Sequence, residues 1–298
     1  MMSEDLEFFF ALLMSGASIG LMYSLIALGF VLVYKATDAI NFAQGEFVML
    51  AGMVVVTVLG MQAPLIAAIV VVLLVMIGFG FGLEKVVLRP LLGRPVVAVI
   101  MATIGVAALL RGWGPLVLGI ETRNLPLPIG DEPITIGPAS LPPIQVLGAV
   151  VALLFFVAFN WFFKKSRMGV AMRAVADNQQ VAQAMGINVE RYFAIAWAMA
   201  GIVSALGGVV WGSMLGVDVQ LALVGLKVFP VVILGGLDSI GGALIGGLII
   251  GIVESLAAGY LDPYVGGGTK DFAPYVLMIL VLMIRPYGIF GRRQIERV

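Results

Sequence analysis

Nine long apolar stretches constrain the fold of this chain more than any other feature of its sequence. They cover residues 8–34, 47–60, 64–83, 96–118, 144–163, 192–216, 222–236, 240–259 and 272–290. A helix that crosses a bilayer needs about 20 predominantly apolar residues. We therefore predict an all-α polytopic membrane protein with eight or nine transmembrane helices in a single transmembrane domain, residues 1–298. Because 47–60 and 222–236 are short, each is a candidate for a broken or re-entrant segment.

The composition excludes a soluble enzyme and several kinds of chemistry. Apolar residues make up 61% of the chain and charged residues 11%, whereas soluble domains are about 25% charged. The chain has no Cys and no His, which removes disulfides, imidazole metal sites and catalytic Ser-His or Cys-His pairs. The net charge is zero, without a basic tract, so nucleic acid is not an expected partner. We expect membrane lipid to surround the chain.

Basic residues gather in alternate loops, and cytoplasmic loops carry an excess of Lys and Arg. If all nine stretches cross, the residues on one side are Lys35, Lys85, Arg89, Arg94, Lys164, Lys165, Arg167, Arg173, Arg191, Arg285, Arg292, Arg293 and Arg297. The other side has Arg123 and Lys270. This bias predicts an external N-terminus, a cytoplasmic C-terminus, and an external position for Glu121 and Asp131.

The longest external connection, residues 119–143, is rich in Pro and Gly. We expect an ordered loop, and two roles stay open for it. It is either a linker between two helices or a lid and docking surface for an external partner.

Glycine is concentrated inside the apolar stretches. The glycines in two of them are Gly201, Gly207, Gly208 and Gly212, and Gly241, Gly242, Gly246, Gly247 and Gly251. Small residues allow helices to approach closely in a membrane. The pattern predicts close packing within the chain, with a subunit seam or a substrate path as alternatives.

Three charged residues, Arg111, Lys227 and Glu254, fall inside or near apolar stretches. Charged side chains at membrane depth are costly and usually functional, although long side chains near a helix end can also extend to the interface. Glu254 is the only carboxylate in this group, which weighs against an ion-coupled secondary transporter.

The segment 36–46, ATDAINFAQGE, interrupts an apolar run with amide and acidic side chains. Amides both donate and accept hydrogen bonds, and a helix that begins here would direct its positive end toward a carboxylate. These features suit a neutral or zwitterionic solute. The alternative is a solvated loop with a helix cap.

The largest basic-side loop, residues 164–191, has the pattern of one short amphipathic helix. Its apolar face would combine Val170, Ala174, Val175, Val181, Ala182 and Met185. Gly186 is placed to end this helix. The helix either lies on the membrane surface or docks into a groove of a cytoplasmic partner.

Three motifs resemble a known family. INFAQGEF at 40–47, SRMGVAMRAVADNQQVAQAMGINVERY at 166–192 and VILGGLDSIGGALIGGLIIGIVESL at 232–256 are similar to the permease subunit of branched-chain amino acid ABC importers, the LivH type. The resemblance spans nearly the full chain. Gln44 stands where many relatives carry His, a departure that bears on the identity of the solute.

The resemblance implies an inner-membrane permease that moves branched-chain or related hydrophobic amino acids by alternating access. Implied partners are a second homologous permease, two cytoplasmic ATPase subunits, and a periplasmic or lipid-anchored amino-acid-binding protein. The chain is then not an enzyme and needs no cofactor, since ATP and Mg belong to the ATPases; the sequence contains no GxxxxGK[ST] phosphate cradle. Alternatives are a urea or short-amide permease of the same family, an ion-coupled secondary transporter and a membrane-embedded enzyme.

The resemblance also suggests two sets of functional residues, without a metal site or a catalytic group. Candidates for the substrate pathway are Asn41, Phe42, Gln44, Gly45, Glu46, Gly235 and Gly236. Candidates for coupling to an ATPase are Gly169, Arg173, Ala174, Asn178, Ala182 and Gly186.

Overall fold

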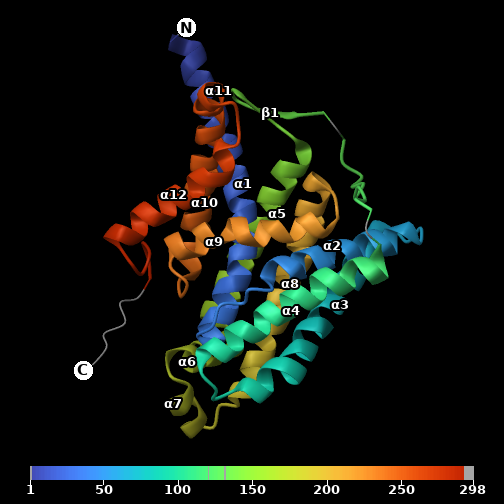
Figure 1. Cartoon of the computed structure of the whole chain (residues 1–298), viewed down its shortest axis with the longest axis vertical. Coiled ribbons are helices and arrows are strands. Elements are labelled where there is room, and N and C mark those ends of the chain that lie inside the picture. The colour runs from blue at the N-terminus through green and yellow to red at the C-terminus, as the bar shows by residue number, and fades with distance from the viewer. Residues whose placement is uncertain (1, 120, 131, 292–298) are drawn as a thin grey trace. The chain divides into compact units, whose positions relative to one another are not determined.

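Helices account for nearly all regular structure in the computed structural model, which describes residues 2–119, 121–130 and 132–291 (Figure 1). The first part of the chain contains α1 (Met2–Thr37), α2 (Gln44–Gly60), α3 (Leu65–Leu83), the π-helix η1 (Glu84–Leu88), the 3-10 helix η2 (Arg89–Leu91) and α4 (Val96–Leu118). The strands β1 (Ile134–Ile136) and β2 (Ala139–Leu141) follow. The remainder contains α5 (Pro143–Lys165), α6 (Arg167–Asp177), α7 (Gln179–Ala184), α8 (Val189–Leu215), η3 (Val219–Ala222), α9 (Leu223–Gly235), α10 (Ile240–Tyr260), α11 (Asp262–Val265) and α12 (Thr269–Ile284).

The helix lengths confirm an all-α polytopic membrane protein. Within the described residues, six helical segments are long and apolar enough to cross a membrane: 4–37, 65–91, 96–117, 143–165, 189–215 and 240–260. The two stretches expected to be short are α2, with 17 residues, and α9, with 13. The ninth stretch is shorter than expected, because α12 ends at Ile284. The predicted positions of Asp131, Arg292, Arg293 and Arg297 lie outside the described residues.

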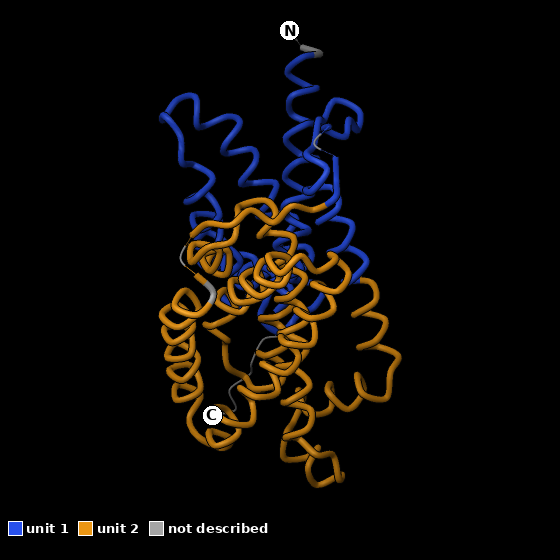
Figure 2. Tube along the Cα trace, turned by 90° about the vertical axis from the view of Figure 1, so that its right-hand side faces the viewer, with its two compact units in different colours: residues 1–27, 128–156, 227–298 blue, residues 28–127, 157–226 orange. Residues whose placement is uncertain are grey.

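The chain forms two compact units (Figure 2). Unit 1 comprises residues 1–27, 128–156 and 227–298, and unit 2 comprises residues 28–127 and 157–226. The chain passes from one unit to the other within α1, in the connection after α4, and within α5 and α9. The single transmembrane domain expected from the sequence stays a prediction.

Glycine allows the helices of unit 2 to touch. In α8, a Cβ at Gly208 would lie 2.7 Å from the backbone nitrogen of Gly52 and 2.7 Å from the carbonyl oxygen of Val48 in α2. A Cβ at Gly201 would collide with the carbonyl group of Met76 in α3. These close approaches confirm tight helix packing within the chain.

Unit 1 uses glycine in the same way. Gly247 of α10 lies against the backbone of Gly20 in α1, and Gly246 lies against the carbonyl of Val231 in α9. After α12, the chain returns to α9, where the amide of Ile289 donates to the carbonyl of Leu234 at 2.8 Å. By contrast, a Cβ at Gly241 would meet open space, so the glycines of α10 do not all serve helix contact.

The long connection after α4 has ordered structure, as the sequence predicts. Its first part is tied down in unit 2, where Arg123 and Val217 exchange two backbone hydrogen bonds of 3.1 and 2.9 Å. In unit 1, β1 and β2 form a short antiparallel hairpin in which Ile134 pairs with Leu141. Gly137 in its turn has φ +60, a conformation that favours glycine.

Candidate functional site

The polar segment before α2 folds into a buried turn of unit 2. Asn41, Gln44 and Glu46 have 0 or 1% of their surfaces exposed, which contradicts the alternative of a solvated loop. The side-chain oxygen Oδ1 of Asn41 accepts a 3.0 Å hydrogen bond from the backbone amide of Ala43, a local bond that favours turns. The helix α2 then begins at Gln44, close to where the sequence predicts a helix start.

The two amides of this turn bond to each other and to α8. The Asn41 side chain donates to Gln44 Oε1 at 3.0 Å, and Gln44 Nε2 donates to Ser204 Oγ at 2.9 Å. Ser204 in turn donates to the carbonyl of Ala200 at 2.8 Å. Because buried amides must find partners, this chain of bonds fixes the start of α2 against α8.

Glu46 forms an ion pair that the sequence did not reveal. Arg111 of α4 donates through Nε to Glu46 Oε1 at 2.8 Å and also through Nη2. The Glu46 side chain is 2% exposed, whereas that of Arg111 is 47% exposed. The pair places a half-exposed guanidinium inside a helix long enough to span a membrane, which is a costly position in lipid. We therefore expect the exposed part of Arg111 to face water or another protein rather than lipid.

The other candidates in this segment also have structural contacts. Gly45 lies against the backbone of Ala222 and Gly225. The amide of Phe42, a half-buried residue, donates to Thr103 Oγ1 of α4 at 3.2 Å. These contacts connect the turn to α9 and α4 within unit 2.

Gly235 and Gly236 belong to unit 1, at the end of α9. Gly235 lies against the backbone of Gly242 at the start of α10. Gly236 has φ +100, and a Cβ there would lie 2.5 Å from the Gly291 nitrogen. The pathway candidates thus fall into two groups, one in each unit.

Unit 1 has its own buried polar group. The Tyr23 hydroxyl donates to Glu254 at 3.2 Å, and Lys227 Nζ lies 3.9 Å from Glu254 and 2.7 Å from Asp271. The three charged residues identified in the apolar stretches, Arg111, Lys227 and Glu254, therefore all have charged or hydrogen-bonding partners within the chain. The expectation that Glu254 is the only buried carboxylate is wrong, because Glu46 and Glu84 are also buried, each with 1% of its surface exposed.

The loop 164–191 contains two helices instead of the single helix predicted. The break falls at Asn178, whose backbone is extended (φ −162, ψ 108) and whose side chain accepts from the amide of Val181 at 2.9 Å. An Asn side chain that caps a new helix competes with continuation of the old one. Gly186 ends α7 as predicted: it has φ +80, and the amide of Ile187 donates to the carbonyl of Ala182.

The two helices do not share one apolar face, contrary to the prediction. Val175 and Ala182 are buried against their own chain, whereas Val170, Val181 and Met185 are 50, 57 and 78% exposed. Within unit 2, Val175 lines a small apolar cavity with Leu32 and Phe163. The split occurs within each helix: Val170 and Val175 both lie in α6, and residues five positions apart point about 140° apart on one α-helix.

The remaining coupling candidates hold the loop in place. A Cβ at Gly169 would lie 2.5 Å from the Phe163 carbonyl oxygen, so α6 turns tightly on the end of α5. Arg173 donates to the carbonyl of Lys164 at 3.4 Å, and Ala174 is half-buried. Asn178 and Gly186 are the exposed candidates, at the break and after the end of α7.

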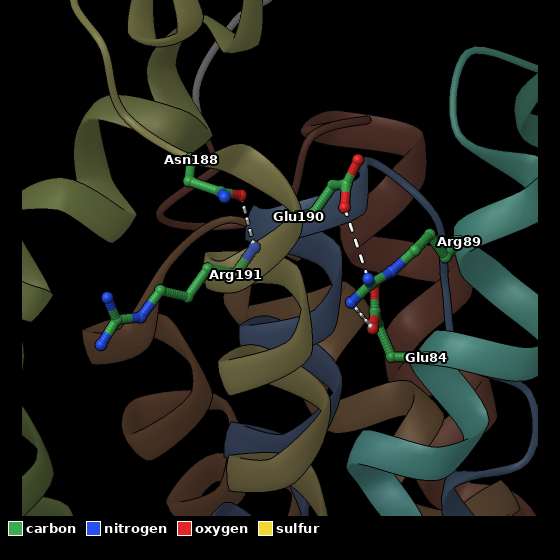
Figure 3. Close-up of polar contacts among 5 residues, drawn as sticks. All are labelled: Glu84, Arg89, Asn188, Glu190 and Arg191. Atoms are coloured by element: carbon green, nitrogen blue, oxygen red, sulfur yellow. Dashed lines mark hydrogen bonds and ion pairs between the residues drawn. The ribbon is translucent and has the colours of Figure 1, made fainter.

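Another ion pair that the sequence did not reveal lies beside this loop (Figure 3). Arg89 binds the buried Glu84 at 2.8 and 3.2 Å and reaches Glu190 of α8 at 3.4 Å. Asn188 caps α8 by accepting from the amide of Arg191 at 3.0 Å. The spacing of Glu84 and Arg89 suits the π-helix between them rather than an α-helix, so a search for i, i+4 pairs overlooks it.

Within the described parts of the chain, no three His, Cys, Asp or Glu residues are grouped closely enough to hold a metal ion. Amides, hydroxyls and paired charges are the groups that the described site presents, and such groups can bind and release a solute.

Helices of membrane-spanning length with buried polar groups inside them define the class of polytopic membrane proteins. The profile of the family described as "Branched-chain amino acid transport system / permease component" matches residues 12–283, and the chain belongs to this family.

Individual relatives agree with the family match. The high-affinity branched-chain amino acid transport system permease protein LivH of Salmonella typhimurium is 31% identical, with 100% of both chains covered. The corresponding protein BraD of Pseudomonas aeruginosa is 32% identical over 96% of this chain and 97% of its own. The ribose import permease protein RbsC of Haemophilus influenzae is 27% identical over 78% of this chain and 72% of its own.

A solved structure supports the fold. A chain of PsaBC from Streptococcus pneumoniae in complex with Fab superimposes with a TM-score of 0.51, at 13% identity, covering 96% of this chain and 97% of that one. At this identity the likeness concerns the fold alone.

Proposed function

We propose that this chain is the membrane subunit of an ATP-driven importer that carries branched-chain or related hydrophobic amino acids into the cytoplasm by alternating access. The observation that carries the proposal is the family match over residues 12–283 together with full-length relatives that are branched-chain amino acid permeases. The chain itself performs no bond-breaking chemistry in this proposal.

The proposed complex contains a second, homologous permease, two cytoplasmic ATPases and a periplasmic or lipid-anchored binding protein. ATP and Mg are held by the ATPases. The membrane is the bacterial inner membrane, with the N-terminus outside and the C-terminus in the cytoplasm. The family description, which names a permease component of a transport system, supports separate motor and receptor subunits.

Transport is tested in proteoliposomes that contain the complete complex and ATP. Uptake of radiolabelled leucine is expected to depend on the binding protein and to stop with a hydrolysis-deficient ATPase. Urea uptake at a comparable rate, without leucine uptake, would favour the urea or short-amide permease. Leucine uptake that continues without ATP and stops when ion gradients are dissipated would favour the ion-coupled transporter.

Orientation is tested with single cysteines, since the native chain has none. Glu121→Cys is expected to react with an impermeant maleimide from outside, and Gln180→Cys only after the membrane is opened. The reverse labelling would overturn the orientation.

For coupling, we propose that the exposed apolar side chains of Val181 in α7 and of Met185 directly after it contact an ATPase. Val181 and Met185 are more than half exposed, and burial of such side chains favours association. Ala182 is buried in this chain, so a charge there would damage the permease itself and would not report docking.

The matched variants are Val181→Glu and Gln180→Glu, which place the same charge at adjacent exposed positions of α7. We expect Val181→Glu to weaken ATPase association about tenfold, because it desolvates a charge against an apolar surface. Gln180→Glu should change association much less. Equal association in both variants and the wild type would place α7 outside the interface.

A further inference from the structure

A cavity of about 250 Å³ lies entirely within unit 2, beside the loop 164–191. Its polar lining includes Thr37, Asp38, Glu84, Arg94, Gln179 and Trp197, and apolar side chains such as Leu88 and Val99 complete the walls. The residues come from the end of α1, from η1 and the turn after η2, and from α4, α7 and α8. None of them is a candidate for the pathway or for coupling.

The charges around this cavity leave one negative and one positive group available. Arg89 neutralises Glu84 through two hydrogen bonds (Figure 3). Asp38 and Arg94 remain, and among the described residues neither side chain has an ion pair or a side-chain hydrogen bond. A ligand with one positive and one negative group would complement both.

Trp197 is fully buried and forms part of the cavity wall. Its indole nitrogen has no acceptor among the described residues, but less than 1 Å² of this atom is accessible, so it is closed to a ligand in the cavity.

The backbone around the cavity is also unusual. Asp38 has φ +53, which is uncommon for a residue other than glycine. Glu84 begins a π-helix, a conformation often found at functional sites. Partial burial raises the pKa of Asp38, as expected for a carboxylate that lacks a cation nearby.

We infer that this cavity is a binding site for a zwitterionic amino acid with an aliphatic side chain, in which Asp38 binds the ammonium group and Arg94 binds the carboxylate. The leucine and valine side chains of the wall would contact the aliphatic part. This inference rests on the proposed function, because it makes the ligand the transported solute. Gln179 of the loop 164–191 lines the cavity, so bound product is placed to slow further import.

The test measures equilibrium binding of radiolabelled leucine to the permease–ATPase complex in nanodiscs, without the binding protein. Wild-type complex should bind leucine, and Arg94→Gln should weaken binding at least about tenfold, the usual effect of losing a charge-assisted hydrogen bond. Val99→Phe should weaken binding similarly by filling the cavity. Arg191→Gln, which removes another exposed arginine that does not line the cavity, should leave binding unchanged.

Two leucine analogues test the requirement for both charges. Isoamylamine lacks the carboxylate and 4-methylpentanoate lacks the ammonium group, and each should compete at least tenfold less well than leucine. The regulatory role is measured as the ratio of uptake with and without leucine inside the proteoliposomes. This ratio should fall well below one for the wild type and for Arg191→Gln, and should approach one for Arg94→Gln.

Each outcome decides one claim. No leucine binding by the wild type, or binding unchanged in both Arg94→Gln and Val99→Phe, would overturn the site. Leucine uptake without such binding would leave the proposed function standing. Binding without any leucine uptake would overturn the proposed function but not the site, and an uptake ratio of one in the wild type would overturn the regulatory role.

Discussion

The two units each bury a glutamate, but they compensate its charge differently. In unit 2, Glu46 receives two donors from Arg111, one of them at 2.8 Å. In unit 1, Glu254 receives one hydroxyl donor at 3.2 Å, while Lys227 lies 3.9 Å away and binds Asp271 at 2.7 Å instead.

Glu46 has a cation of its own, whereas Glu254 shares its cation with Asp271. A carboxylate taken out of water must be compensated nearby, and the guanidinium does this for Glu46 alone. Lys227 divides its charge between Glu254 and the exposed Asp271. We therefore expect unit 2 to be sensitive to loss of a single cation and unit 1 to be more tolerant.

The largest expected effect is that of Arg111→Leu, which leaves Glu46 buried without its cation. Removal of one partner from a buried pair typically costs about 3–5 kcal/mol, and the exposure of Arg111 places this variant near the lower limit. The double variant Glu46→Gln/Arg111→Leu should recover much of the loss. Thermal unfolding of the purified permease, followed by tryptophan fluorescence, measures both, and equal midpoints for the two variants would contradict the comparison.

Next in size are glycine substitutions that separate touching helices, one in each unit. Gly208→Leu in unit 2 and Gly246→Leu in unit 1 should each destabilise by about 1–3 kcal/mol, since the obstructing atoms are backbone. Gly241→Leu, on the same helix as Gly246 but facing open space, is the matched control and should be neutral or slightly stabilising. Similar stability of Gly246→Leu and Gly241→Leu would show that α10 packs differently.

Tyr23→Phe is expected to have a smaller effect, because it removes the single hydroxyl bond to Glu254. Hydrogen bonds to charged groups contribute about 1.5–3 kcal/mol, and the 3.2 Å length favours the lower value. Tyr260→Phe, at an exposed position of α10, is the control. A loss as large as that in Arg111→Leu would show that Glu254 is no more tolerant than Glu46.

The smallest effect concerns a carboxylate outside the membrane segments. Asp262 accepts from the hydroxyl and the amide of Thr269, the latter at 2.9 Å, and these bonds lower the pKa of Asp262 below 3.8. Stability from this bond is present above pH 3.8 and is lost as the pH falls through the lowered pKa.

Thr269→Val should therefore lower the unfolding temperature slightly at neutral pH, and the difference from the wild type should shrink as the pH falls below 3.8. Thr57→Val, which removes a hydroxyl bonded only to the Met53 carbonyl, should show a pH-independent difference. The same independence in Thr269→Val would contradict the role assigned to Asp262.

The sequence by itself determined the helical class, the positions of the apolar segments, the short length of α2 and α9, and the end of α7 at Gly186. These features follow from local properties of the chain: hydropathy over about 20 residues and the conformational freedom of glycine. The three motifs also predicted the family, which the comparisons confirmed.

Only the tertiary structure decided which charges are paired and which faces are buried. Arg111 and Glu46 are 65 residues apart, and Tyr23 and Glu254 are 231 apart, so no local pattern links them. The burial of Ala182 depends likewise on the neighbours that α7 meets, whereas the break at Asn178 is a local cap that hydrophobic periodicity does not register. Hydrophobic periodicity is a property of residues that are close in the sequence. Desolvation and Coulomb attraction depend on distances through space, and these distances are set only when the protein folds.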